Sequence, residues 1–336
     1  MVIKLKITYA IKRIFRMDLK RTFADVARVA KKSKKSWIYI FADMIYCGMK
    51  YGAGPLDYDL FEFYNLNAKQ RKTYVTRGVN NALVKKYNDR NFWHVFDNKN
   101  EFNEIFKDFI HRDWILTENM SKEDFLKFAS DKTGLIYKPI DGTCGRGIEK
   151  IMFDKMPVDE AYEYLCKKTN GIIEEIIVQH SDISKVYPLA INTIRVVTIL
   201  KNDVVTPVFA FWRIGNNGKF VDNLNSGGMA AIVNTENGRI TLPAADKNGD
   251  TYTSHPYTNE QIVGFEIPMW NEIIKTVTMA AKVLPQISYV GWDIALSQDS
   301  IQIIEGNCFP GHDILQLPAY TPDKIGLMPK IKQFLV

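Results

Sequence analysis

The chain has 336 residues, of which 46% are hydrophobic and 24% are charged. A chain of this length and apolar content can bury a substantial core, which excludes a disordered or fibrous protein and favours two or three packed subdomains. None of the four cysteines forms a Cys-x-x-Cys pair and the five histidines do not cluster, so neither a zinc site nor a disulfide framework is indicated. Reduced thiols in the cytoplasm are therefore expected.

The net charge of +6 is unevenly distributed. Residues 1–35 carry twelve Lys and Arg against Asp18 and Asp25, a net charge of +10, and the remainder carries −4. Partial helical periodicity predicts one or two helices in this basic segment. These helices either contact an anionic membrane surface or an acidic polymer, or they are solvated helices docked on the main body. A nucleic-acid role is not expected, because base-stacking aromatics are not interleaved with the basic residues and the body is acidic.

No signal peptide or membrane span is predicted near the N-terminus. The basic segment is too long for an n-region and no clean apolar h-region follows it. The most apolar stretch, residues 37–49, is interrupted by Asp43 and is shorter than the ~20 residues that a bilayer span requires.

The first third of the chain reads as mainly helical. We expect helices up to about residue 90, with a loop at residues 52–59 and a second helical stretch that ends near residue 86. Further helices are predicted at about 100–111 and after Ser121, which stands in capping-box spacing with Asp124.

The rest of the chain mixes strands with a few helices. The pattern predicts strands at 135–138 and 148–153, a helix at 157–168, and an apolar strand at 172–178. A hairpin is expected over 193–212 with its turn at 201–203, then a helix at 270–284 that stops before Pro285, and a strand pair over 288–305. Neither an internal repeat nor a low-complexity linker marks a domain boundary.

A glycine-rich loop joins the first two of these strands. In YKPIDGTCGRGIEKI (residues 137–151), Lys138 precedes Gly142, Gly145 and Gly147. Glycines let backbone N–H groups approach phosphate oxygens, and the lysine adds a point charge. The order differs from both the Walker and the Rossmann loops, so this motif alone leaves a hairpin without a ligand open as the alternative.

Two carboxylates are predicted to face each other in the last strand pair. If that hairpin is centred on Asp299, Asp293 lies opposite Glu305, and Asn307 projects to the same face. Opposed like charges, with Cβ atoms about 5 Å apart, destabilise a sheet and are tolerated best when a cation sits between them. Two carboxylates and an amide oxygen suit Mg²⁺ that also holds phosphate oxygens. A solvent-facing hairpin with two unrelated acids is the alternative, although the apolar neighbours of both acids favour burial.

Taken together, these motifs resemble the ATP-grasp superfamily. They are the lysine before GxxGxG, a later strand with two glutamates, an NTIR strand, and Asp293 followed by EGNCFPG at residues 305–311. Within the superfamily, GAGPLDYDLFEFYNL, NTIRVVTIL and GWDIALSQDSIQIIEGN resemble the sugar-transfer-associated proteins found with bacterial surface-polysaccharide genes. The resemblance is most specific over residues 95–318.

The resemblance implies an α+β protein with the ATP-grasp fold, in which two α+β lobes clamp ATP. The implied division is a basic helical region at 1–94, an N-lobe with the glycine-rich loop at 95–178, and a C-lobe with the metal-binding hairpin at 179–336. Lys99 and Lys138 would be the nucleotide lysines, the glycine loop would cover the β- and γ-phosphates, and the two glutamates with the backbone near Ile177 would form the adenine and ribose hinge.

The residues 192–213 and the following DNLNSGG also resemble the ribosomal-protein glutamate ligases, in which the matching arginines and asparagines would face the acyl group and the triphosphate. The resemblance thus implies ATP contacts by Lys99, Lys138, Gly142, Thr143, Gly145, Arg146, Gly147, Glu174, Glu175, Ile177, Asn223 and Asn225, magnesium ligation by Asp293, Glu305 and Asn307, and catalysis by Arg195 and Arg213.

One position departs from the peptide-forming relatives. D-alanine ligases place an arginine two residues before the metal aspartate, and here that position is Gly291. Either Arg195 or Arg213 then stabilises the oxyanion, or the acceptor chemistry differs. For each arginine an ordinary strand salt bridge is the alternative.

The implied activity is that of an ATP- and Mg²⁺-dependent carboxylate–amine ligase acting through an acyl phosphate. It would amidate a sugar acid or attach an amino acid in bacterial capsule or exopolysaccharide biosynthesis. The alternatives are a kinase for a sugar or polyol hydroxyl and a non-catalytic nucleotide-binding module in glycan assembly. A cytoplasmic location is expected, with residues 1–35 as a possible contact to the inner membrane face.

Overall fold

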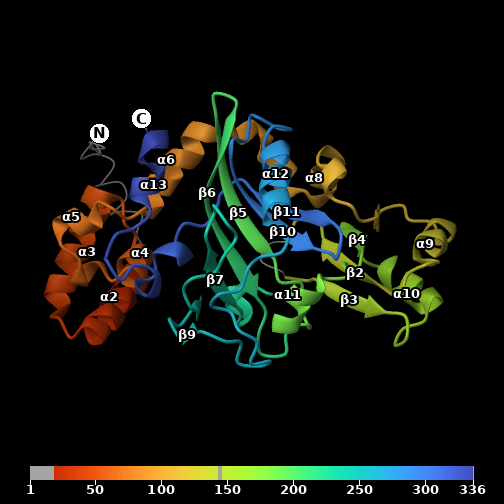
Figure 1. The fold of residues 1–336 in the computed structure, drawn as a ribbon, viewed down its shortest axis with the longest axis horizontal. Coiled ribbons are helices and arrows are strands. Elements are labelled where there is room, and N and C mark those ends of the chain that lie inside the picture. The colour runs from red at the N-terminus through yellow and green to blue at the C-terminus, as the bar shows by residue number, and fades with distance from the viewer. Residues whose placement is uncertain (1–18, 143–145, 336) are drawn as a thin grey trace. The chain divides into compact units, whose positions relative to one another are not determined.

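The computed structural model describes residues 19–142 and 146–335 and divides the chain into two compact units (Figure 1). One unit combines the residues up to 86 with those from 311 onward, and the other comprises residues 87–310. Each unit has a hydrophobic core of its own. No helix within the described residues is both long enough and apolar enough to cross a membrane.

The first unit is helical. Ser36 caps α3, because its hydroxyl accepts from the Tyr39 amide at 3.2 Å, and Gly52 ends that helix in the left-handed conformation. The C-terminal segment joins the unit through Gln316, whose side-chain amide both accepts from and donates to the backbone of Val75 at 2.7 and 2.9 Å. The elements of this unit are α2 (Leu19–Ser33), α3 (Trp37–Tyr51), α4 (Pro55–Leu60), η1 (Phe63–Asn65), α5 (Ala68–Arg71), α6 (Arg77–Tyr87), η5 (Ile314–Gln316), η6 (Pro318–Tyr320) and α13 (Met328–Leu335).

The loop predicted at residues 52–59 is wrong, because most of it forms α4. Pro55 stands at the first helical position, where its missing N–H costs nothing and its fixed φ suits a helix. The Asp57 carboxylate accepts from the Gly54 amide at 3.0 Å and so caps the helix. Here Gly-Pro marks the beginning of a helix instead of a turn.

The second unit contains a small antiparallel sheet that carries the glycine-rich loop. Its order among the described residues is β1-β4-β2-β3, and the loop joins β2 to β3 as predicted. Helices α9 and α10 cover one face of this sheet, where Phe125 and Leu165 are fully buried against Leu135 (Figure 1). The elements are β1 (Trp114–Leu116), α9 (Lys122–Ala129), β2 (Gly134–Pro139), β3 (Glu149–Met152), α10 (Val158–Leu165) and β4 (Gly171–Glu175).

The larger sheet of the second unit has the order β11-β10-β5-β6-β7-β8-β9 within the described residues. The predicted hairpin of β5 and β6 is confirmed. Helix α12 packs on this sheet and ends at Ala280, earlier than predicted, because the next residues close i→i−3 hydrogen bonds in place of helical ones. The strands are β5 (Ile194–Lys201), β6 (Val204–Ile214), β7 (Met229–Val233), β8 (Ala244–Asp246), β9 (Thr251–Tyr252), β10 (Tyr289–Leu296) and β11 (Ile301–Asn307).

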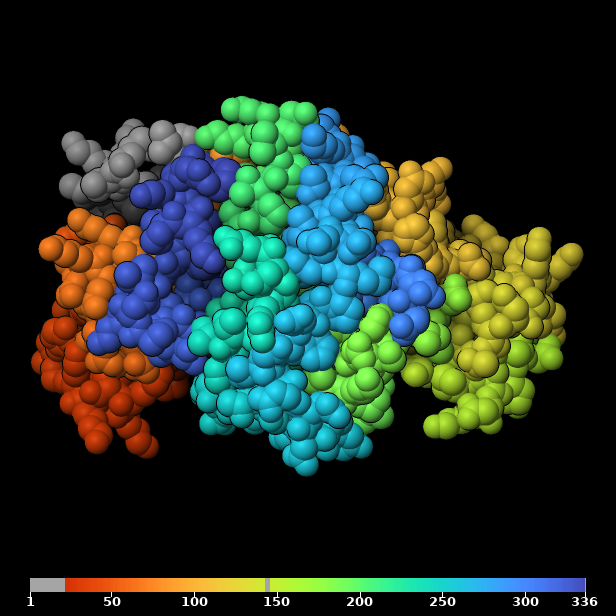
Figure 2. Space-filling view, viewed as in Figure 1, coloured from red at the N-terminus to blue at the C-terminus, as the bar shows by residue number. Residues whose placement is uncertain are grey.

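The remaining helices of this unit are short, and α8 ends before the predicted residue 111 because a 3₁₀ turn follows it. They are η2 (Arg90–Phe92), α7 (His94–Asp97), α8 (Lys99–Ile105), η3 (Lys107–Phe109), α11 (Ser181–Val186), η4 (Leu224–Ser226) and α12 (Trp270–Ala280). In the space-filling view, the surface of this unit is indented between the light-green segment near residue 185 and the yellow-green segments near residue 155 (Figure 2).

The terminal hairpin has the predicted pairing at its carboxylates. Asp293 lies opposite Glu305, and Gly291 lies opposite Asn307. The register then shifts by one residue, so that Ile294 pairs with Ile303 and Ile304 is the extra residue of a β-bulge. Beyond the bulge, the strands pair one residue out of the register predicted for a hairpin centred on Asp299, and the turn lies between Leu296 and Ile301.

Candidate active site

A cavity of about 290 Å³ lies in the second unit and draws its walls from both sheets. Its volume is near the lower end of the range for small-molecule sites. Its lining combines several lysine and arginine side chains with a group of aliphatic side chains. The lining residues are Lys99, Ile136, Lys138, Pro139, Gly142, Arg146, Ile148, Lys150, Glu174, Glu175, Ile176, Ile177, Gln179, Ser184, Pro188, Leu189, Ala190, Ile191, Thr193, Arg213, Phe220, Val221, Asp222, Asn223, Ile304 and Glu305.

The cavity collects ten of the residues proposed from the sequence: Lys99, Lys138, Gly142, Arg146, Glu174, Glu175, Ile177, Arg213, Asn223 and Glu305. Gly147, Arg195, Asn225, Asp293 and Asn307 do not line it. Thr143 and Gly145 lie outside the described residues, as do residues 1–18 of the basic segment. The sequence motifs that lie far apart in the chain thus converge mainly on one enclosed space.

Lys99 connects α8 to the glycine-rich loop. Its ammonium donates to the carbonyl oxygens of Ile140 and Gly142 at 3.0 and 2.6 Å. Burial lowers the pKa of Lys99, and the negative charge of Glu305 opposes that effect. Gly147 has a left-handed φ of 73°, and a Cβ there would lie 2.9 Å from Pro139, so the loop requires glycine at this position.

Glu174 on β4 is the centre of a buried ionic cluster. Its two oxygens accept from the Arg112 guanidinium at 3.0 Å each, it pairs with the Lys138 ammonium, and it accepts from the Asn103 amide at 3.2 Å. Burial alone would raise the pKa of Glu174, but the charges of Arg112 and then of Lys138 outweigh burial and hold it well below its usual range. Glu174 therefore orients the Lys138 ammonium.

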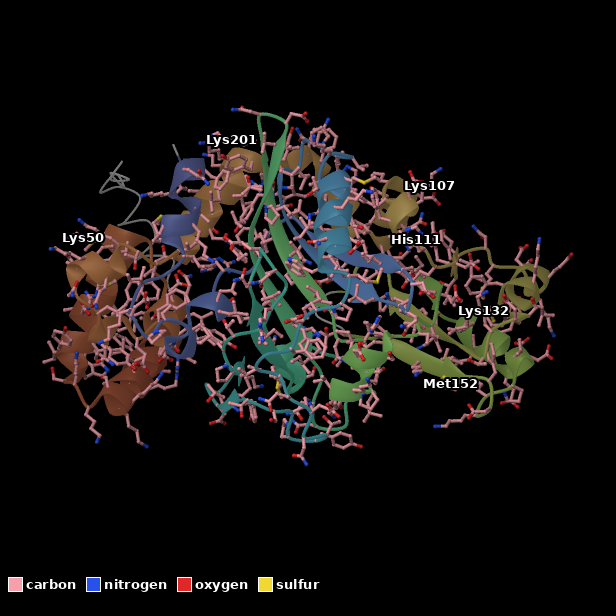
Figure 3. The ribbon with its side chains drawn as sticks, in the orientation of Figure 1. Lys50, Lys107, His111, Lys132, Met152 and Lys201 are labelled. Carbon is pink, nitrogen blue, oxygen red and sulfur yellow. The ribbon has the colours of Figure 1, made fainter. Side chains whose placement is uncertain are left out.

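Arg112 also reaches the other sheet, and sequence reasoning missed it. Its guanidinium donates to the carbonyls of Ile303 and Ile304 at 2.9 and 3.3 Å, which are the residues at the bulge of β11. His111, whose φ of 49° is left-handed, precedes it and turns the chain before β1 (Figure 3). Arg112 thus ties Glu174 to the strand that carries Glu305.

Asp293 is fully buried and is held by two arginines. Arg195 binds both of its carboxylate oxygens, and Arg213 Nη2 lies 3.1 Å from Oδ2. Burial would raise the pKa of Asp293, but the charges of Arg195 and Arg213 lower it below its ordinary value. The cations beside this carboxylate are guanidinium groups, and magnesium ligation by Asp293 stays a prediction.

Gly291 provides the space that Arg195 occupies. A Cβ on Gly291 would lie 3.0 Å from Arg195 Cδ. Arg195 stands opposite Asp293 on the neighbouring strand β5, so its side chain crosses the position from which an arginine at residue 291 would project. Arg195 therefore brings a guanidinium from the adjacent strand into the space beside Gly291.

Glu305 and Asn307 form the open part of the acidic group. The Glu305 side chain is 45% exposed because it opens on the cavity, and Asn307 Nδ2 lies 3.5 Å from its Oε1. Enclosure by the protein and the charge of Asp293 raise the pKa of Glu305. Arg195 Nη2 stands 3.8 Å from Glu305, so it faces both acids.

Asp222 anchors the loop that carries the two proposed asparagines. Its carboxylate accepts from the Thr193 amide at 2.9 Å and from Arg213 Nε at 3.3 Å. Asn223, next to it, lines the cavity and caps η4, whereas Asn225 does not reach the cavity. Asp222 and Thr193 are further residues that sequence reasoning missed, although both stand in segments that the resemblance singled out.

The two antiparallel sheets and the lysine-lined cavity between them are the arrangement of an ATP-grasp protein. The sequence model of the sugar-transfer associated ATP-grasp family matches residues 78–334, which is more than half of the chain, and the chain belongs to this family. This confirms the resemblance that the sequence motifs indicated. No curated protein matches the chain.

Matched solved structures include ATP-grasp ligase PsnB complexed with a minimal precursor, at 15% identity, with 73% of this chain and 63% of that chain covered and a TM-score of 0.42. D-alanine–D-alanine ligase from Bacillus anthracis matches at 15% identity, 83% of each chain and a TM-score of 0.43. D-alanyl-alanine synthetase A from Vibrio cholerae O1 matches at 13% identity, 72% and 64% coverage and a TM-score of 0.44. The chain covers less than two thirds of the length of PsnB.

Proposed function

We propose that this protein is an ATP-dependent carboxylate–amine ligase that acts on a sugar acid or attaches an amino acid in bacterial capsule or exopolysaccharide biosynthesis. The observation that carries the proposal is the convergence of Arg195 and Arg213 on Asp293 beside a cavity that Lys99 and Lys138 also line. Several cations around one space suit a reaction in which negative charge moves from ATP to an acyl group. Membership of the sugar-transfer associated family supports the link to sugars.

ATP would lie along the cavity with its phosphates beside the cationic side chains. Lys99, Lys138 and Arg146 supply those cations, whereas Ile176 and Ile177 follow directly after the last residue of β4 and offer an apolar surface to the adenine. Lys138 is oriented by Glu174, so that its position does not depend on the ligand. We propose that these residues bind and align the nucleotide.

The donor set fits Mg²⁺ in part. Glu305 and Asn307 supply hard oxygen ligands next to the cavity, and a bound metal would neutralise phosphate charge there. Both oxygens of Asp293 bind guanidinium groups, so Asp293 would share its remaining lone pair with a metal. Within the described residues, no cluster of three or more His, Cys, Asp or Glu side chains is arranged to hold a metal.

The two arginines would provide the electrostatic part of the chemistry. A substrate carboxylate oxygen attacks the γ-phosphorus, the bond to the β-phosphate oxygen breaks, and ADP leaves with the electron pair. An amine then attacks the acyl phosphate carbon, and phosphate leaves with its electron pair while the amine loses a proton. Arg213, which lines the cavity, and Arg195, which lies over Gly291, face the region in which the oxyanion would form.

The proposal is tested by incubating the protein with Mg-ATP and pools of sugar acids and amines. ADP, inorganic phosphate and product mass are followed together. A ligase releases ADP and phosphate in step with an amine-dependent adduct, whereas a kinase releases ADP and transfers the phosphate to its product. Formation of a phosphorylated sugar or polyol without free phosphate would replace the ligase proposal with the kinase.

A matched pair of variants tests the assignment of Asp293. Asp293→Asn is expected to abolish ADP formation, because it removes the charge that holds both arginines in place. Asp203→Asn is the control, since the Asp203 side chain is 88% exposed and pairs only with surface Lys282 in the described structure. Turnover by Asp293→Asn at the rate of the control would show that the assignment is wrong, provided that both variants unfold cooperatively.

A further inference from the structure

The outward face of α3 in the helical unit is apolar along its length. Ile38 is 75% exposed and Met49 is 45% exposed, and between them lie exposed Ala42 and half-buried Ile45. Positions 38, 42, 45 and 49 follow the i, i+4, i+7, i+11 spacing of one helix face. We call these four residues the α3 stripe.

The inward face of the same helix is apolar as well. Ile40, Met44 and Cys47 are buried in the core of the helical unit. The only acidic residue of α3 is Asp43, and its carboxylate accepts from Arg71 and from the Tyr58 hydroxyl at 2.7 Å, so its charge is neutralised within the unit. A helix that is hydrophobic on all sides normally has both faces covered.

Aromatic side chains border the α3 stripe at its N-terminal end. Trp37 stacks on Phe23 and Phe41 with ring centroids 5.7 and 5.3 Å apart, and remains 40% exposed. Tyr39 and Tyr46 are 46% and 40% exposed. Tryptophan and tyrosine at the edge of an apolar surface are typical of side chains that sit at the boundary between lipid and water.

Lysines stand at both ends of the α3 stripe. Lys31, Lys32 and Lys34 are exposed just before α3, and exposed Lys50 lies in its last turn. Lys32 also lies 3.4 Å from Asp59, so part of its charge is balanced within the unit. An apolar surface with cations at its rim is complementary to a bilayer that carries anionic headgroups.

We propose that the α3 stripe and its lysine rim form a docking surface for an anionic lipid bilayer. The helix has 15 residues and is about 22 Å long at 1.5 Å per residue, which is too short to cross a ~30 Å hydrocarbon core. It therefore lies in the plane of the interface. A second copy of the chain fits this face less well, because two copies would bring the same lysines together.

This surface is separate from the cavity and from the proposed ligase chemistry. It also differs from the membrane contact expected for residues 1–35, because its apolar part lies at residues 38–49. The lysines before α3 are shared by both. Binding through α3 would hold the protein at an anionic membrane surface, whatever reaction the cavity performs.

The test is cosedimentation of the full chain with phosphatidylcholine vesicles, with and without phosphatidylglycerol. We expect binding only to the anionic vesicles, and weaker binding as salt is raised. In Ile38→Asp/Met49→Asp, binding is expected to fall about tenfold or more, because the charges must enter the interface. The control is Val204→Asp/Met279→Asp, which places the same charges on exposed residues of the other unit and leaves binding unchanged.

Two further measurements keep the proposal falsifiable if the stripe variant folds poorly. Brominated phosphatidylglycerol should quench tryptophan fluorescence of the native chain, and Trp37→Phe should lose most of that quenching. Sedimentation velocity reports whether the native chain associates with itself. Equal vesicle binding by the stripe variant and the control, no quenching through Trp37, or a dimer that only the stripe variant disrupts would each overturn the proposal.

Discussion

Replacing Arg112 with alanine removes the residue that joins the two sheets beside the cavity. The Arg112 side chain is 1% exposed, and the Glu174 side chain to which it donates twice is 3% exposed. Breaking a buried ion pair by removing one partner costs about 3–5 kcal/mol. Glu174 keeps Lys138 and Asn103 as partners, so we expect about 3 kcal/mol, the lower end of that range. A loss of that size lowers the unfolding temperature by about 6–12 °C.

Thermal and urea unfolding measure this loss, and Arg239→Ala is the matched control. The ion pair between Arg239 and Glu266 spans 3.7 Å with side chains that are 54% and 69% exposed, so its removal should cost no more than about 1 kcal/mol. Arg112→Lys should be intermediate, because lysine keeps the charge but lacks the planar fork. The reasoning is refuted if Arg112→Ala is no less stable than Arg239→Ala.

A second readout separates positioning from general stability. Arg112 donates to the carbonyls of Ile303 and Ile304 at the bulge, two residues and one residue before Glu305. Without these bonds, amide hydrogen exchange across β11 should accelerate more than exchange in β6. Equal acceleration in both strands would mean that Arg112 only stabilises the unit and does not position Glu305.

Three further changes test separate parts of the site. Gly291→Ala should lower kcat roughly tenfold or more with little change in unfolding temperature. The new Cβ would stand 3.0 Å from Arg195 Cδ and shift the guanidinium, so an unchanged kcat would contradict this prediction. Lys99→Met should raise KM for ATP more than it lowers kcat, because the lysine holds the glycine-rich loop through the Gly142 carbonyl at 2.6 Å. Steady-state kinetics with varied ATP measures the two parameters separately. Glu174→Gln should lower the free energy of unfolding most at pH values above about 4.3, the ordinary pKa of glutamate in an unfolded chain. The folded chain holds the pKa of Glu174 below that value, so the loss relative to the native chain should shrink as the pH falls below about 4.3. Urea unfolding at neutral pH and near pH 3 measures this loss. A loss of unfolding free energy that is larger near pH 3 than at neutral pH would contradict the prediction.

Local sequence signals predicted most of the elements near the site. A hairpin centred on Asp299 placed Asp293 opposite Glu305, and the glycine-rich loop between two strands appears where the turn residues indicated. Both features depend on residues that are close together in the chain. The loop predicted at residues 52–59 failed for a related reason, because Gly54-Pro55 is compatible with a turn and with a helix start, and the capping bond from Asp57 decides for the helix.

Features that depend on pairing between distant segments could not be predicted. Arg112 lies 62 residues from Glu174 and 191 residues from Ile303, and a lone arginine before a short strand gives no signal of either contact. The bulge at Ile304 is equally hidden, because Ile303 and Ile304 have the same side chain and nothing in the sequence marks which of them pairs with Ile294. Only the packing of one sheet beside the other determines which carbonyls an arginine can reach.

Asp293 shows that an electrostatic argument can establish the need for positive charge without identifying the cation. The opposition of Asp293 and Glu305 does require positive charge nearby, and the sequence offered magnesium as the simplest source. The strand order places β5 next to β10, however, so Arg195 stands directly opposite Asp293 and its guanidinium faces both acids. The fold thus places a guanidinium beside both acids. A metal held by Glu305 and Asn307 would then share Asp293 with the guanidinium groups, because each carboxylate oxygen has two lone pairs.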